Sequence, residues 1–145
     1  MEVTSIAFRN GENIPKKYTC EGEDMNPPLA INDAPMSTKS FALIVDDPDA
    51  PTGIWVHWVV WNIKPEIREI PEAAKQIGVE GITDFRRAGY DGPCPPPGKP
   101  HRYFFKLYAL DIILDLASNA TKSQLEKSMK GYILAKAELM GTYQR

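Results

Sequence analysis

The stretch His101–Asp111 reads HRYFFKLYALD, and apolar side chains recur in it at every second position. A period of two is typical of a β-strand with one buried face, and the aromatic residues strengthen that interpretation. On this pattern Arg102 and Lys106 point away from the buried face. The residues predicted to share the buried face are His101, Tyr103, Phe105, Leu107 and Ala109. We therefore expect a strand here that starts with a histidine.

Two other long segments, Ser40–Asp47 and Ile54–Ile63, alternate in the same way. Their odd-numbered residues should share one face of each strand. These residues are Phe41, Leu43, Val45 and Asp47 in the first segment, and Trp55, His57, Val59, Trp61 and Ile63 in the second. Shorter strands are expected over Thr4–Phe8 and Ile133–Tyr143.

One helix is predicted after Thr121, in the segment KSQLEKSMKG. Thr121 and Gln124 have the spacing of a capping box, and Gly131 provides a C-terminal stop. A second short helical turn is expected over Pro71–Lys75. Many strands with few helices favour antiparallel sheets packed face to face. We therefore predict a mostly β chain, an antiparallel β-sandwich with one or two short helices, forming a single domain over residues 1–145.

Composition and charge exclude several classes of partner. The net charge is −2 and no basic run is present, so nucleic acid, which is bound through clustered Lys and Arg, is not expected. No apolar run approaches the roughly 18 residues of a membrane span, which argues against integral membrane association. The opening segment MEVTSIAFRNGENIP has no signal-peptide pattern. We expect a cytoplasmic protein.

The chain has two cysteines, Cys20 and Cys94. They are too few and too far apart for a zinc ribbon or a Cys-x-x-Cys redox motif. Without a secretory signal, free thiols are the expectation, and whether the two meet in space is left open.

Five prolines fall within eight residues in the segment GYDGPCPPPGKPHRYFF, Gly89–Phe105, immediately before His101. Proline fixes its backbone and supplies no N–H, whereas Gly92 and Gly98 permit close backbone approach. This composition predicts a rigid loop that forms one wall of a small, preformed cavity, which lowers the entropic cost of binding.

Polar groups interrupt the apolar faces at three points. Asp47 ends one face, His101 begins another and His57 lies within a third, so the three could meet near one end of a sandwich. Each has a simpler explanation: an Asx turn is favoured for Asp47–Pro51, DPDAP, and a single histidine is more often a satisfied core residue. The cavity interpretation stands beside these alternatives because the chain's only two histidines both adjoin rigid loops. Two imidazoles, the Tyr103 hydroxyl and exposed amides near Gly92 would suit an oxyanion, phosphate above all, with carboxylates orienting the rings.

The order of three motifs resembles the phosphatidylethanolamine-binding protein family, in its compact bacterial and archaeal branch. The motifs are DPDAP, GIWVHWVVWNI and GPCPPPGKPHRYFFKLYALD, and the segments YTCEGEDMNPPL and ILAKAELMGTYQR also fit. The resemblance implies a β-sandwich with a small anion pocket at one end and no cofactor. The ligand-binding positions that it implies are Asp47, Asp49, Pro51, Trp55, His57, Gly92, Pro93, His101 and Tyr103. Arg102 is expected to hold structure and not ligand.

The chain also departs from the family pattern. The segment TDFRRAGY stands where many relatives have Asn-Asp-Phe-Gly, so Arg86 is expected to alter the pocket rim or an ion pair. The loop before His101 is shorter than in animal members, and the extra C-terminal helix that covers their site is not expected. Binding of a small phosphate-bearing head group is therefore better supported than recognition of a whole phospholipid.

We predict a non-catalytic binding protein for a small anionic or phosphorylated ligand. The resemblance further implies a protein kinase or serine protease as the regulated partner, and a homodimer. The alternative is a hydrolytic enzyme that uses His and Asp for acid–base chemistry, with Cys94 in the pocket-forming loop. A metal site made of Asp47, Asp49, His57 and His101 is a weaker alternative, because ligand types suit zinc but the spacing does not support it.

Overall fold

Five antiparallel strands form the larger of two sheets in the computed structural model, which describes residues 1–145. Their order is β6-β4-β3-β7-β8, so β3 lies at the centre. The strands are β3 (Ser40–Asp47), β4 (Trp55–Ile63), β6 (Val79–Glu80), β7 (His101–Leu110) and β8 (Ile133–Tyr143). The strands β3, β4 and β7 were predicted from the period of two, with bounds that differ by at most one residue. The strand β8 has the bounds expected for a strand at the end of the chain.

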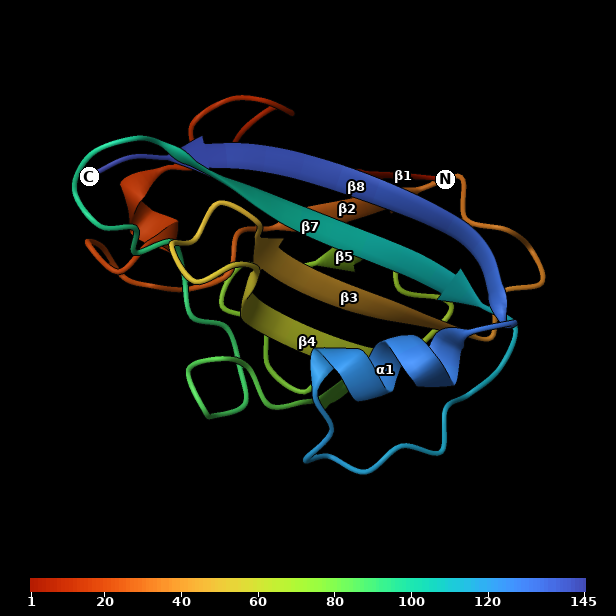
Figure 1. Cartoon of the computed structure of the whole chain (residues 1–145). Helices are drawn as coiled ribbons and strands as arrows, with labels where there is room; N and C mark the ends of the chain where they lie inside the picture. Colours follow the sequence, from red (N-terminus) through yellow and green to blue (C-terminus); the bar gives the residue numbers. More distant parts are fainter.

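A smaller sheet of three antiparallel strands packs against one face of the larger sheet (Figure 1). It has the order β1-β2-β5 and consists of β1 (Glu2–Thr4), β2 (Leu29–Asn32) and β5 (Glu69–Ile70). A 3-10 turn, η1 (Lys16–Tyr18), follows β1 along the chain. The predicted antiparallel β-sandwich is confirmed.

The apolar interior divides into two clusters, one on each face of the larger sheet. The first lies between the sheets and joins residues such as Leu29 and Ile31 to Phe105 and Leu107 of β7. The second lies on the opposite face, beneath the single α-helix, α1 (Lys122–Met129). Figure 1 shows α1 in front of the larger sheet and the smaller sheet behind it.

The helix begins as its sequence predicts. The Thr121 side chain accepts a hydrogen bond from the Gln124 amide, and the Gln124 side chain accepts one from the Thr121 amide, which completes a capping box. Gly131, with φ +89°, follows the last turn. Leu125 and Met129 are buried against the sheet and fix the helix in place.

A β-bulge in β4 changes the faces predicted for its side chains. Val45 of β3 pairs with Trp58, but the next residue, Asp46, pairs with Val56, so His57 is an extra residue without a partner. A second irregularity lies between the Leu43–Val60 and Phe41–Ile63 pairs. Each extra residue shifts the alternation by one position.

The predicted common face of β4 is therefore wrong. Val59 and Trp61 lie in the cluster beneath α1, whereas Ile63 lies between the sheets. Trp58, which was expected on the opposite face from His57, is a core residue between the sheets. A strict period of two cannot anticipate a bulge, because the bulge itself resets the period.

Two shorter predictions were also wrong. The first strand ends at Thr4 and does not run over Thr4–Phe8, because the Ser5 hydroxyl accepts the Ala7 amide and turns the chain. Pro71–Lys75 forms no helical turn. Its amides at Ala73 and Ala74 donate to the backbone and side-chain oxygens of Asn26 instead of to each other.

The free thiols expected at Cys20 and Cys94 are replaced by a disulfide bond between them. The bond joins positions 74 residues apart in the sequence, which no local pattern indicates. The Ala50–Pro51 bond is trans. Among the helices, none has the length and apolar character needed to cross a membrane.

The assignment of faces in β7 can be tested with two neighbouring phenylalanines. Phe105 is completely buried between the sheets, whereas Phe104 lies half-buried on the other face beneath the cations of Arg102 and Lys106. Phe105→Ala should lower the free energy of unfolding by about 3–5 kcal/mol through the cavity that it leaves. Phe104→Ala, the matched control, should lower it by about 1 kcal/mol. Urea denaturation measures both, and equal losses would contradict the assignment.

Candidate functional site

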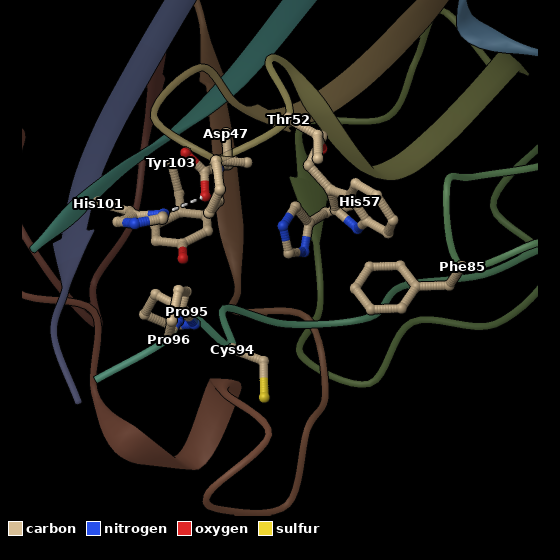
Figure 2. Close-up of a pocket in the computed structure, with 12 residues that line it drawn as sticks. Asp47, Thr52, His57, Phe85, Cys94, Pro95, Pro96, His101 and Tyr103 are labelled. Carbon is tan, nitrogen blue, oxygen red and sulfur yellow. Dashed lines mark hydrogen bonds and ion pairs between the residues drawn. The ribbon is translucent and has the colours of Figure 1, made fainter. Parts of the chain in front are cut away.

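A cavity of about 270 Å³ lies at the end of the larger sheet where β3 ends and β4 and β7 begin. We call it the end cavity. Its walls come from the loop after β3, the first residues of β4 and β7, and the proline-rich loop (Figure 2). Its lining residues are Asp47, Ala50, Pro51, Thr52, Trp55, His57, Phe85, Cys94, Pro95, Pro96, His101 and Tyr103. Both histidines of the chain are among them.

His101 forms a hydrogen bond with Asp47 in the wall of the end cavity. Nδ1 of His101 lies 2.7 Å from Oδ2 of Asp47, and both residues are buried. A carboxylate can only accept, so Nδ1 carries the proton and donates it. The second carboxylate oxygen, Oδ1, accepts the Asp49 amide at 2.7 Å, which is the Asx turn expected from the sequence. Asp47 therefore shapes its loop and orients the imidazole at once.

His57 is held by a backbone carbonyl. Its Nδ1 lies 2.6 Å from the carbonyl oxygen of Asp91, and because a carbonyl only accepts, this nitrogen is also the donor. The Asp91 carboxylate is in turn bound by the guanidinium of Arg87, which fixes the loop that carries the carbonyl. Burial lowers the pKa of His57 below its ordinary value, against the smaller opposing effects of the Asp91 carbonyl and of the carboxylates of Asp47, Asp91 and Asp24. The ring is therefore neutral near pH 7.

The Nε2 atoms of both imidazoles make no hydrogen bond within the chain. They are not sealed off either, since the one sealed side-chain nitrogen or oxygen without a partner is the Trp61 indole nitrogen. His57 is 3% exposed and His101 8%, and both residues line the end cavity. Each Nε2 is therefore available to form a hydrogen bond with a bound group.

Aromatic rings pack around the two histidines. Tyr103 lies edge-on to His57 with ring centroids 5.3 Å apart, and Phe85 meets His57 at 5.2 Å and Trp55 at 5.7 Å. Burial raises the pKa of Tyr103, so its hydroxyl keeps its proton and can donate. The end cavity thus combines a few polar atoms with walls that are largely apolar, as small-ligand sites usually do.

The proline-rich loop is fastened to the segment Tyr18–Asp24. The Gly92 amide donates to Oδ1 of Asp24 at 2.8 Å, and the Pro93 carbonyl accepts the Cys20 amide at 3.1 Å. A Cβ atom at Gly92 would lie 2.2 Å from the Tyr18 carbonyl oxygen, so no other residue fits there. The disulfide adds a covalent link between the same two segments.

Asp49 is turned away from the end cavity. Its carboxylate receives the amide, Nε and Nη2 of Arg102, each at 2.9 Å. This pairing, chiefly the side-chain hydrogen bond, lowers the pKa of Asp49 to about 2. Arg102 faces away from His101, as expected, and ties the loop after β3 to the start of β7.

The nine predicted ligand-binding residues thus separate into two groups by position. Six line the end cavity, namely Asp47, Pro51, Trp55, His57, His101 and Tyr103. The other three, Asp49, Gly92 and Pro93, hold its walls. The amide of Gly92 itself is not available to a ligand, because it donates to Asp24. Whether the six contact a ligand stays a prediction.

Sequence reasoning did not select six lining residues: Ala50, Thr52, Phe85, Cys94, Pro95 and Pro96. Most of them neighbour a selected residue in the two loops. Phe85 is the exception, since it comes from a third segment far from both. Next to it, Arg86 has φ +64°, a conformation that glycine adopts without strain. Arg86 is not among the lining residues, and the ion pair in this segment joins its neighbour Arg87 to Asp91.

No group of three or more His, Cys, Asp or Glu side chains is placed to hold a metal ion. The four residues of the alternative zinc site, Asp47, Asp49, His57 and His101, do not form one group, because the Asp49 carboxylate is bound to Arg102. What remains at the end cavity is two imidazoles that each offer one free nitrogen, a protonated phenol and a carboxylate already in use. These groups suit hydrogen bonding to a small oxygen-rich molecule.

Comparison with known proteins places the whole chain in one group. A family model described as phosphatidylethanolamine-binding protein matches residues 4–144. A UPF0098 protein of Chlamydia muridarum is 48% identical over 100% of this chain and 99% of its own, and one of Pyrococcus abyssi is 49% identical over 100% and 86%.

Two solved structures are similar over nearly their full length. The structure of a phosphatidylethanolamine-binding protein homolog from Chlamydia trachomatis has 45% identity and a TM-score of 0.96, covering 99% of this chain and 97% of that one. Escherichia coli YbcL, described as a member of the mammalian family, has 34% identity and a TM-score of 0.92, with coverage of 99% and 98%.

The environment of His57 predicts a pH dependence of stability. Its folded-state pKa lies below the ordinary 6.5. Between pH 6.5 and that lower value, His57 is therefore protonated in the unfolded chain but neutral in the folded chain. The free energy of unfolding should therefore fall as the pH drops below 6.5, by at most about 1.4 kcal/mol per pH unit from this residue. Urea titrations in buffers without oxyanions measure the slope. The slope should be shallower in His57→Gln, and an identical slope would contradict the assignment.

Proposed function

Because the chain belongs to the phosphatidylethanolamine-binding protein family, we propose that it is a non-catalytic binding protein whose end cavity recognises a small oxyanion of the phosphate type. The observation that carries this proposal is the pair of nearly buried imidazoles that line the same cavity, each with one nitrogen that has no partner within the chain. Two such nitrogens and the Tyr103 hydroxyl form a set of hydrogen-bond donors once the rings are protonated. An oxyanion supplies several acceptors in a small volume.

The two rings are held by different acceptors. At His101, Nδ1 already donates to Asp47, so Nε2 is the ring nitrogen that a ligand could contact. At His57, Nδ1 is committed to the Asp91 carbonyl and burial keeps the ring neutral, so Nε2 is an acceptor until a proton arrives. A bound anion would favour that proton by electrostatic attraction. Binding of an anion without a proton of its own would therefore take up about one proton at His57.

The walls limit what accompanies the anion. Trp55, Phe85 and the two prolines Pro95 and Pro96 offer apolar surface, and the volume of about 270 Å³ is small. A phosphate group with a short organic substituent, such as a phospholipid head group, fits these properties better than a large metabolite.

A protein partner is the second part of the proposal. The family resemblance implies that such a chain regulates a protein kinase or a serine protease, and it also implies a homodimer. The relation of either to the end cavity is open to experiment.

The alternative of a hydrolytic enzyme has one observation in its favour. The Asp47–His101 pair has the arrangement of a general base oriented by a carboxylate. Cys94 is not available as a nucleophile for this alternative, since its sulfur is bonded to that of Cys20. We therefore keep binding as the main proposal.

Histidine NMR signals provide the direct test of oxyanion binding. Titration with inorganic phosphate or phosphoethanolamine should shift the ring signals of both His57 and His101. His101→Ala and His57→Ala should each weaken binding by about tenfold or more through loss of a charge-assisted hydrogen bond. Lys136→Gln, an exposed control on β8, should bind as the unchanged protein does. Signals that stay fixed at millimolar phosphate would overturn the proposal.

Sulfate separates the proton requirement from the chemistry of the anion. Sulfate carries two charges throughout pH 5–8, so its affinity should rise as the pH falls toward the pKa of His57, and calorimetry should detect proton uptake. Phosphate, which can bring its own proton, should show a weaker dependence. Sulfate binding of constant affinity over this range would contradict a neutral His57 in the free protein.

Inhibition assays test the regulatory part. If a panel of serine proteases or kinases reveals an inhibited enzyme, His101→Ala should abolish the inhibition where the end cavity is responsible. Inhibition that survives the substitution would place it on another surface. Phosphate ester hydrolysis by the unchanged protein, lost in His101→Ala, would favour the enzymatic alternative.

A further inference from the structure

The disulfide bond is a covalent cross-link in the wall of the end cavity. Cys94 lines the cavity (Figure 2). Its disulfide partner, Cys20, belongs to the segment that supports the proline-rich loop. Both cysteines are exposed, so small thiols can reach the bond from solvent. Disulfides that only stabilise an interior are shielded from such attack.

A cation lies directly against both sulfurs. Nη1 of Arg145 is 3.2 Å from the Cys94 sulfur and 3.7 Å from the Cys20 sulfur. A guanidinium at this distance stabilises a thiolate and makes it a better leaving group. The contact favours release of Cys94, the closer of the two, when the bond is opened.

We propose that Cys20–Cys94 is a thiol–disulfide exchange site that sets the affinity of the end cavity; the effect on affinity rests on the proposed function. The thiolate of a small thiol of the glutathione class attacks the Cys20 sulfur. The bond to Cys94 breaks, and Cys94 leaves as a thiolate beside Arg145. A second thiolate then attacks the sulfur of the bound small thiol, which releases Cys20 and forms the oxidised small-molecule disulfide. Two electrons enter the protein, and each protein thiolate takes up a proton according to its pKa.

Opening the bond changes the cavity without removing all support for its wall. The Gly92 amide still donates to Asp24, and the Gly98 amide still donates to the Arg145 carbonyl. Between these two points the loop loses its covalent tether, so its preorganised shape is weakened. A thiolate at Cys94 also places negative charge on the lining of a site for anions. Both effects lower the affinity for phosphate.

The predicted cytoplasmic location bears on which form of the Cys20–Cys94 pair is present. Cytoplasmic thiols keep most cysteines reduced, and disulfides that do form there commonly act in redox sensing. In that setting the oxidised chain would be the form with higher affinity.

The exchange step is tested on the full chain by mass spectrometry after quenching with an alkylating reagent. Reduction by glutathione should proceed through a mixed disulfide at Cys20. Arg145→Gln should slow the reduction by about three- to tenfold, because the leaving thiolate loses its counter-charge. The matched control Arg9→Gln removes an exposed cation elsewhere and should leave the rate unchanged. Equal rates in all three proteins, or a bond that resists millimolar glutathione, would overturn the exchange site.

The effect on the cavity is tested by phosphate titration of the oxidised and reduced protein, followed by histidine NMR. Reduction should raise the phosphate dissociation constant by about three- to tenfold. Cys94→Ser lacks the disulfide and has no thiolate at residue 94, so it should show only part of the rise in the phosphate dissociation constant. Cys20→Ser lacks the disulfide but keeps the Cys94 sulfur, so it should show the full rise. Dispersed amide spectra verify that each protein is folded.

The two proposals fail in different ways. If oxidised protein binds no phosphate, the proposed function fails, while the exchange rates are still measured. If oxidised and reduced protein bind phosphate equally, oxyanion binding stands and redox control is wrong.

Discussion

The central position of β3, paired on both sides to antiparallel neighbours, is the constraint on which the rest of the structure depends. Its pairing with β4 and β7 fixes where those two strands begin, because Asp47 lies opposite Trp55 and Asp46 opposite Phe104. The end of β3 and the beginnings of β4 and β7 therefore meet at one edge of the sheet, although β7 begins far along the chain from the other two. The strands leave space at this edge of the sheet, and the surrounding loops enclose that space as the end cavity.

Adjacent residues at the end of β3 show how one strand serves two faces. Asp47 turns toward His101 at the cavity, and Asp46 turns to the other face, where it pairs with Lys106 and Lys122. Both carboxylates are almost fully buried, and each would be costly without its partners. The same alternation that separates the two apolar clusters thus places the Asp46–lysine ion pairs beneath the helix and the Asp47–His101 hydrogen bond at the cavity.

Elements with a regular sequence pattern were predicted correctly, whereas elements without one were missed. The strands around Phe41 and Phe105 and the capping box at Thr121 follow from local periodicity and local hydrogen bonding. The strands β2, β5 and β6 are only two to four residues long and carry too little pattern to stand out. At the cavity, proximity of the histidines was foreseen, but the partners of Asp49 and Gly92 were not, since they come from Arg102 and Asp24 in other segments.

The bulge at His57 has an implication for how this architecture can vary. The imidazole is carried by the one residue of β4 at that point that has no partner in β3, so the strand pairing does not depend on its identity. The ladder on either side would persist with another side chain at that position. Specificity at the end cavity can therefore diverge between descendants of one ancestor while the framework that supports it is inherited intact.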